Sequence, residues 1–313
     1  MKTIKVISII FIIILFSIIS GIYFLKPKPI AKPTAAVTID ADLSFAVFGD
    51  VHENIEHFQE AIKDLYTINP HMDALVLNGD TVDQGLQEQY DSVKKILREN
   101  EELLPKIIIK NIGNHEFFDY NLEVNSPQQV QDFINRYLEF SGEEKVYHDT
   151  WVNDYHFISL GSEDGNSETI NSSTALISKE QRNWLKEKLA ENYQKGKPIF
   201  VFLHQHLDSK NTGWIGVQES EQVRQILSQY PEVILFTSHT HRDLDESSVV
   251  LNQPFTMVHT GAIHYTLIPD PNSENGRRDE PYIKAVYIEV KDNNVVVKGR
   301  NIKDKQWIFT KEL

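Results

Sequence analysis

The 313-residue chain contains no cysteine. Disulfides, zinc sites built from thiolates and cysteine nucleophiles are therefore excluded, and any bound metal must be held by nitrogen and oxygen ligands. Hydrophobic residues nevertheless make up 41% of the chain. That is enough to bury the core of one large domain or two modest ones, and nothing in the composition indicates disorder.

Positive charge is also scarce, with 31 Lys and Arg residues against 45 Asp and Glu residues. No acidic residue precedes Asp40, and the first 39 residues contain five lysines. The remainder is therefore about five units more acidic than the formal net charge of −14 indicates. A surface of this sign repels a nucleic acid backbone unless a bound cation inverts the local field. We expect no nucleic acid partner, and a polynucleotide-directed nuclease is disfavoured, although a smaller phosphodiester remains open.

Charged residues are absent from Val6 to Leu25, a run of twenty residues preceded by Lys2 and Lys5. A helix of this length spans the hydrocarbon core of a bilayer. A cleaved signal peptide is the competing interpretation, but its apolar region is usually shorter, and the nearest small-residue cleavage pattern, around residues 34–36, lies well past the run. We predict an uncleaved single-pass transmembrane anchor over residues 1–25.

The segment after the apolar run is rich in proline and lysine, which predicts an extended linker over residues 26–41 and one folded domain over residues 42–313. The charges beside the apolar run do not predict the orientation of the anchor, because the amino terminus and two lysines on one side equal the three lysines on the other. The short amino-terminal tail and the absence of cysteine favour an exported, extracytoplasmic domain.

Short apolar runs that end in polar, metal-capable residues recur from Leu43 onward. These runs end at Asp50 and His52, at Asp80 and Asp83, at Asn114, His115 and Glu116, at His204 and His206, and at His239 and His241. Apolar residues at three- and four-residue spacings predict helices over residues 54–68, 87–100, 126–140, 178–194 and 220–230. Alternation of strand and helix predicts a layered α/β fold, in which ligands bind beyond the carboxyl ends of the strands.

The carboxyl-terminal part has a different pattern. Residues 282–302 and 306–313 alternate between apolar and polar side chains, as antiparallel strands do, with a turn at residues 292–294. We therefore expect mixed sheets and no separate second domain.

The last apolar run ends with His239 and His241, which project to the same side if the backbone is extended. Two histidines in a loop are more often solvated than ligands, so this pair alone is a weak signal. The order of the motifs is stronger: GDVH at 49–52, GDTVD at 79–83, GNHE at 113–116, a histidine after the next strand, and HTH at 239–241. In this order they resemble the calcineurin-like metallophosphoesterases.

That resemblance implies a layered β-sandwich of mixed sheets flanked by helices, and two metal ions in one site. It assigns Asp50, His52 and His241 to the first ion, Asn114, His204 and His239 to the second, and Asp80 to a bridge between them. Carboxylate, amide and imidazole ligands suit Mn, Fe, Zn, Co or Mg, and the sequence does not choose among them. The resemblance further implies a hydroxide, held by the two ions, that attacks phosphorus, with His115 as the catalytic histidine.

Some positions depart from the family pattern or stay open. Ser238 stands where the family usually has glycine before H-x-H, and the HQH sequence offers His206 beside the favoured His204. Asp83 occupies the position at which purple acid phosphatases carry a tyrosine, so a tyrosinate-bound ferric ion is not expected. Glu116 either orients His115 or is a solvated turn residue.

The sequence therefore predicts a membrane-anchored, metal-dependent phosphoesterase that acts on a small phosphomonoester or phosphodiester. The alternative is a membrane-anchored scaffold of the same fold that binds a protein partner without catalysis. Loss of catalysis should damage the ligand set or His115, and both are intact. Arg277 and Arg278 offer charge to a phosphate, but solvation at the surface is the more ordinary role for such a pair.

Overall fold

A computed structural model describes residues 41–207, 216–252 and 254–313. The predicted anchor, residues 1–25, and the predicted linker up to residue 40 lie outside the described residues. Within the described ranges, no helix has the length and apolar character needed to cross a membrane.

One six-stranded sheet has the order β14-β13-β12-β1-β2-β3. Strands β1, β2 and β3 are parallel, with β3 at one edge, whereas β12, β13 and β14 continue the sheet from β1 in antiparallel fashion. The strands are β1 (Leu43–Phe48), β2 (Ala74–Asn78), β3 (Ile107–Asn111), β12 (Lys284–Lys291), β13 (Asn294–Asn301) and β14 (Gln306–Glu312).

A second six-stranded sheet has the order β4-β5-β6-β7-β9-β8, with parallel pairing from β5 through β9 and an antiparallel strand at each edge. Its strands are β4 (His148–Val152), β5 (Tyr155–Ser159), β6 (Ile199–Phe202), β7 (Val233–Thr237), β8 (Val249–Val250) and β9 (Thr256–His259). A separate two-stranded hairpin consists of β10 (Thr266–Asp270) and β11 (Ser273–Asp279).

The two large sheets pack face to face through an aromatic core. The Phe45 ring of β1 lies 4.9 Å from both Phe157 and Phe200 of the second sheet, in edge-to-face geometry. Every residue of β1 is buried, because one face of the strand meets the second sheet and the other meets helices. A near-continuous apolar run is what a strand covered on both faces requires.

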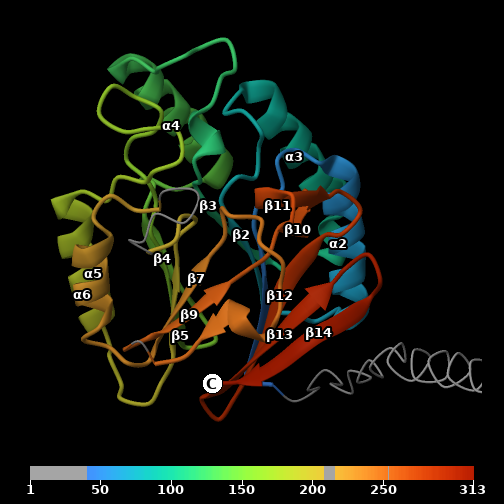
Figure 1. The fold of residues 1–313 in the computed structure, drawn as a ribbon. Coiled ribbons are helices and arrows are strands. Elements are labelled where there is room, and N and C mark those ends of the chain that lie inside the picture. The colour runs from blue at the N-terminus through green and yellow to red at the C-terminus, as the bar shows by residue number, and fades with distance from the viewer. Residues whose placement is uncertain (1–40, 208–215, 253) are drawn as a thin grey trace, which may run out of the picture. The chain divides into compact units, whose positions relative to one another are not determined.

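Helices cover the outer face of each sheet (Figure 1). The first sheet is covered by α2 (Ile55–Ile68), α3 (Gln87–Glu99) and α4 (Pro127–Ser141), and the second by α5 (Lys179–Ala190) and α6 (Ser220–Leu227). Short 3₁₀ turns lie at η1 (Glu101–Leu103), η2 (His115–Phe117) and η3 (Glu246–Ser248). The predicted fold, mixed sheets in layers flanked by helices, is confirmed.

The predicted helices and motif-bearing strands all form, although α5 and α6 end three or four residues earlier than the sequence pattern indicates. The described residues belong to one compact unit. Since β1, β2 and β3 run parallel, as do β6 and β7, the carboxyl ends within each set lie along one edge of their sheet. The two edges meet, because the His204 ring beyond β6 bonds through Nδ1 to the Asn78 carbonyl at the end of β2, at 2.8 Å.

Candidate metal centre

The predicted ligands occupy loops that leave these strand ends. Asp50 and His52 follow β1, Asp80 follows β2, and Asn114 follows β3. The other three, His204, His239 and His241, follow β6 and β7. All seven side chains are buried.

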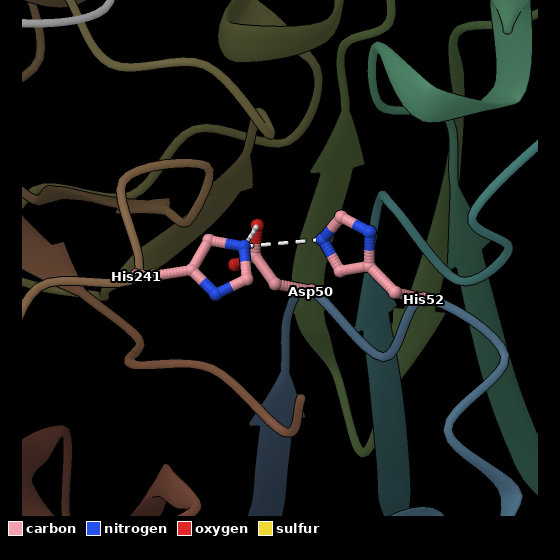
Figure 2. Close-up of side chains that lie close together, drawn as sticks. All are labelled: Asp50, His52 and His241. Carbon is pink, nitrogen blue, oxygen red and sulfur yellow. Dashed lines mark hydrogen bonds and ion pairs between the residues drawn. The ribbon is translucent and has the colours of Figure 1, made fainter. Parts of the chain in front are cut away.

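Asp50, His52 and His241 form the first cluster (Figure 2). The His241 Nε2 atom lies 3.4 Å from Asp50 Oδ1 and 3.1 Å from His52 Nε2. Figure 2 shows the two imidazoles approaching the carboxylate from opposite sides, His52 from the loop after β1 and His241 from the loop after β7. A group of one oxygen and two nitrogens at such separations can converge on one cation.

Asp80, His204 and His239 form the second cluster, with potential ligand atoms within 4.8 Å of one another. Asp80 Oδ2 lies 3.0 Å from His204 Nε2 and 3.8 Å from His52 Nε2, a member of the first cluster. The Asp80 carboxylate therefore lies between the two clusters. That is the position in which one carboxylate can contact two ions.

Five of the seven predicted ligands have a backbone conformation that L-residues seldom adopt. Their φ angles are 53° for Asp50, 48° for His52, 49° for Asp80, 70° for His239 and 51° for His241. None is a glycine, so each position carries a conformational cost, and such positions gather at functional sites. The sequence does not predict these positive φ angles, because glycine and asparagine are the residues that usually adopt them.

The hydrogen bonding and protonation of the ligand atoms fit divalent cations. Among the described residues, Asp50 Oδ1 and Asn114 Oδ1 are buried acceptors that receive no hydrogen bond. Burial raises the pKa of Asp50 to about 8, so its ionised form needs a nearby positive charge. Burial also lowers the pKa of His52 to about 4 and that of His241 below its ordinary value, which keeps both imidazoles neutral, as ligation requires.

Backbone carbonyls orient two of the imidazoles. The His204 Nδ1 bonds to the Asn78 carbonyl, and the His241 Nδ1 to the Tyr265 carbonyl at 3.1 Å. In both rings the proton on Nδ1 is thereby fixed, and Nε2 presents its lone pair to the clusters.

His115 lies beside the ligands, and Asp83 orients it. The His115 Nδ1 bonds to the Asp83 carbonyl at 2.9 Å and lies 3.4 Å from Asp83 Oδ1. The same Oδ1 lies 3.3 Å from His52 Nδ1, while the other oxygen accepts a hydrogen bond from the Tyr120 hydroxyl. His115 Nε2 remains the atom able to face a substrate. We did not identify this role of Asp83 from the sequence, although it lies three residues after Asp80 in GDTVD.

Glu116 fulfils neither of its two sequence-based interpretations. It is 1% exposed, so the solvated-turn interpretation is wrong. Its carboxylate does not hold the His115 ring; it accepts hydrogen bonds from the backbone amides of Asp80, Thr81 and Gly113, at 3.0, 2.9 and 2.7 Å. Glu116 therefore joins the loop after β2 to the loop after β3.

The structure also accounts for Ser238 in place of the family's usual glycine. Its hydroxyl accepts a hydrogen bond from Asn78 Nδ2 at 2.9 Å and contacts the Thr260 hydroxyl at 2.7 Å. Positive φ occurs at the next residue, His239, so position 238 does not need glycine. Of the HQH pair, His204 lies in the second cluster, while the His206 ring centroid is 6.2 Å from that of His239.

Comparison with protein families matches residues 43–243 to the profile described as calcineurin-like phosphoesterase. The match covers every residue of the two clusters. Comparison with curated proteins gives no match.

Two solved structures share the fold. Purple acid phosphatase PPD1 from yellow lupin (Lupinus luteus) seeds aligns with a TM-score of 0.60 and 14% identity, over 86% of this chain and 53% of that one. GAP50, the anchor in the inner membrane complex of Plasmodium, aligns with a TM-score of 0.54 and 14% identity, over 87% and 88% of the two chains. This chain thus spans about half of the lupin protein. At such identity the likeness shows the fold alone.

Proposed function

The chain belongs to the calcineurin-like phosphoesterase family, and from that premise we propose that it hydrolyses a small phosphate ester at a dinuclear metal centre. The observation that carries this proposal is the position of Asp80 between two clusters of buried ligands. In the proposal Asp50, His52 and His241 would hold one ion, Asn114, His204 and His239 would hold the other, and Asp80 would contact both.

Two such ions, when bound, would polarise the phosphoryl oxygens and lower the pKa of a water molecule that attacks phosphorus. The protein's own groups complete the reaction. Burial lowers the pKa of His115, but the Asp80 and Asp83 carboxylates outweigh it and raise that pKa above its ordinary value, which favours the imidazolium. The imidazolium would give the proton on Nε2 to the leaving oxygen, while its Nδ1 proton stays bonded to Asp83. Asp83 is a positioning residue that sets the ring's orientation, and Glu116 fixes the loops that carry Asp80 and His115.

The metals we propose are Mn, Fe, Zn or Co, since the ligands are oxygen and imidazole nitrogen. Asp83 stands where the tyrosine of a purple acid phosphatase would be, so a tyrosinate-bound ferric ion is not part of the proposal. The substrate is a small phosphomonoester or phosphodiester.

We also propose that residues 1–25 anchor the chain in a membrane and that the catalytic domain is extracytoplasmic. The support is the twenty-residue run without charge from Val6 to Leu25 and the lack of cysteine.

A scaffold without catalysis is the alternative, and GAP50, described as an anchor, has the same fold. The intact ligand clusters and the strained backbone of their residues favour catalysis, because a binding scaffold has no need to bury acceptors such as Asn114 Oδ1 without a hydrogen bond.

Hydrolysis of p-nitrophenyl phosphate and of bis(p-nitrophenyl) phosphate, with Mn added to metal-free protein, tests the proposal. We expect turnover of at least one ester and its loss in Asp80→Ala. The comparison of the two esters decides between monoester and diester. Protein that binds metal yet hydrolyses neither ester, with any of the four metals, would support the scaffold instead.

A further inference from the structure

The β10–β11 hairpin is attached directly to the backbone of the candidate metal centre. The His264 amide donates to the Asp50 carbonyl at 2.8 Å, and the Leu267 amide donates to the His241 carbonyl at 2.7 Å. The hairpin belongs to neither large sheet, and it follows the last of the metal-binding motifs (Figure 1). Its position is therefore tied to two of the predicted ligands.

A stack of side chains leads from the site into this hairpin. The Tyr265 ring lies on the His241 ring, with centroids 4.1 Å apart and planes at 18°. The Arg278 guanidinium of β11 lies over the same Tyr265 ring, at 4.2 Å from its centroid. Two planar groups this close to the centre of one ring occupy its opposite faces, which agrees with the 5% exposure of Tyr265. Arg278 is thus held one aromatic ring away from the metal cluster.

The Arg278 donors remain available to an anion. In the described part of the chain, the guanidinium takes part in no salt bridge and no hydrogen bond, and the residue is exposed. A guanidinium that lies over an aromatic ring keeps its N–H groups as donors, and these can bind a carboxylate or phosphate.

Resting on the proposed function, we infer that Arg278 determines specificity by binding a second anionic group of the substrate, on the part that leaves. The intervening Tyr265 ring keeps the guanidinium off the reacting phosphoryl group. The preferred substrate class is then a phosphate ester whose leaving group carries a carboxylate or a further phosphate.

Arg277 is a matched control. It precedes Arg278 on the same strand, carries the same charge and is exposed. In the β10–β11 register Arg277 lies opposite Ile268, and Arg278 lies opposite Leu267. Successive strand residues point to opposite faces, so Arg277 faces away from the Tyr265 stack. Arg277→Ala removes the same charge from the hairpin without touching the stack.

The test compares 3-carboxyphenyl phosphate with phenyl phosphate, whose phenolic leaving groups are similarly basic and differ by one carboxylate. We expect the wild-type protein to prefer the carboxylated ester in kcat/KM, and Arg278→Ala to reduce that preference about tenfold, as for a charge-assisted hydrogen bond at a partly solvated site. Arg277→Ala should keep the preference, and Arg278→Lys should keep part of it. Equal losses on both esters, or no loss on either, would overturn the inference.

A binding measurement separates this inference from the proposed function. Calorimetry with Mn-loaded protein compares 3-carboxybenzylphosphonate with benzylphosphonate, neither of which can be hydrolysed as an ester. We expect the carboxylated compound to bind more tightly, and Arg278→Ala to abolish about the same tenfold difference. If wild-type protein hydrolysed no ester but kept this difference, the proposed function would fail while the role of Arg278 stood. If both compounds bound equally to wild-type protein, the inference would be wrong whatever the activity.

Discussion

The Glu116 carboxylate lies against the backbone of Asp80, whose amide donates a hydrogen bond to Oε2 at 3.0 Å. The same oxygen accepts a bond from the Gly113 amide at 2.7 Å. One buried side chain thus fixes the distance between the loop that carries the proposed bridging ligand and the loop that carries Asn114 and His115. Its effect on the metal centre is indirect, through backbone position.

We predict that Glu116→Gln lowers the free energy of unfolding by about 1–3 kcal/mol, because an amide nitrogen replaces an acceptor that faces buried N–H groups. Metal affinity should fall as well, since Asp80 loses its support. Urea unfolding and metal titration measure the two effects. Glu123→Gln, at an exposed position of the next loop, is the control and should change neither.

Metal content tests the proposed dinuclear centre. Purified protein should bind two transition-metal ions per chain, and Asp80→Ala should lose more metal than any other single ligand change, because in the proposal that carboxylate contacts both ions. Elemental analysis after metal loading gives the ratio. Saturation of the wild-type protein at one ion, even in excess metal, would contradict the two-ion arrangement.

Strand periodicity places the predicted ligands at strand ends, for a physical reason. Asp50, Asp80 and Asn114 each follow an apolar strand, and parallel strands place their carboxyl ends at one edge. Ordinary strand and helix periodicity is enough to find those ends. The sequence therefore predicts those parts of the site whose geometry follows from helices and strands.

Contacts between loops cannot be predicted from the sequence in the same way. The role of Glu116 in joining the loops after β2 and β3 is evident only from the folded structure. Tyr265 and Arg278 likewise reach the site through a hairpin that carries no family motif. Their partners are set by tertiary packing, which short-range patterns do not encode.

Asp83 should affect rate more than metal content. Asp83→Asn keeps an acceptor for the Tyr120 hydroxyl but removes the negative charge near His52 and His115. We predict a loss of roughly tenfold to a hundredfold in kcat, with little change in KM, because the histidine is less well oriented. Since Asp83 acts through His115, the variant Asp83→Asn should cost little further rate in a His115→Ala background. Additive losses in this double-mutant cycle would show an independent role.

The amino-terminal segment should determine where the protein is found. We predict that the full chain partitions into membranes, whereas a chain that begins at Ala41 is soluble and keeps its activity, because the described domain does not depend on residues 1–40 for its clusters. Fractionation measures the first property and ester hydrolysis the second. Full-length, unprocessed protein in the soluble fraction would overturn the anchor, and protease added to intact cells tests whether the domain is exported.

His115 offers the sharpest separation of a catalytic role from a metal-binding one. Its ring lies close enough to His52 and Asp80 to be counted with them as a possible metal-binding group, so its role is not settled by proximity. If the imidazole protonates the leaving oxygen, its removal matters most for alcohols that leave poorly, because a nitrophenolate departs without a proton. We therefore predict that His115→Ala loses roughly 10² to 10⁴ in rate on an alkyl phosphate and less on a p-nitrophenyl ester.

The metal content and the fold of His115→Ala should stay those of the wild-type protein, as elemental analysis and circular dichroism would show. Equal rate losses on the alkyl and p-nitrophenyl esters would instead indicate that the imidazole stabilises charge on the transferring phosphoryl group, which every substrate shares. Loss of one metal ion in the variant would place His115 among the ligands. The proton donor would then have to be sought among the other groups beside the ligands, where the ring centroids of His264 and His52 lie 5.1 Å apart.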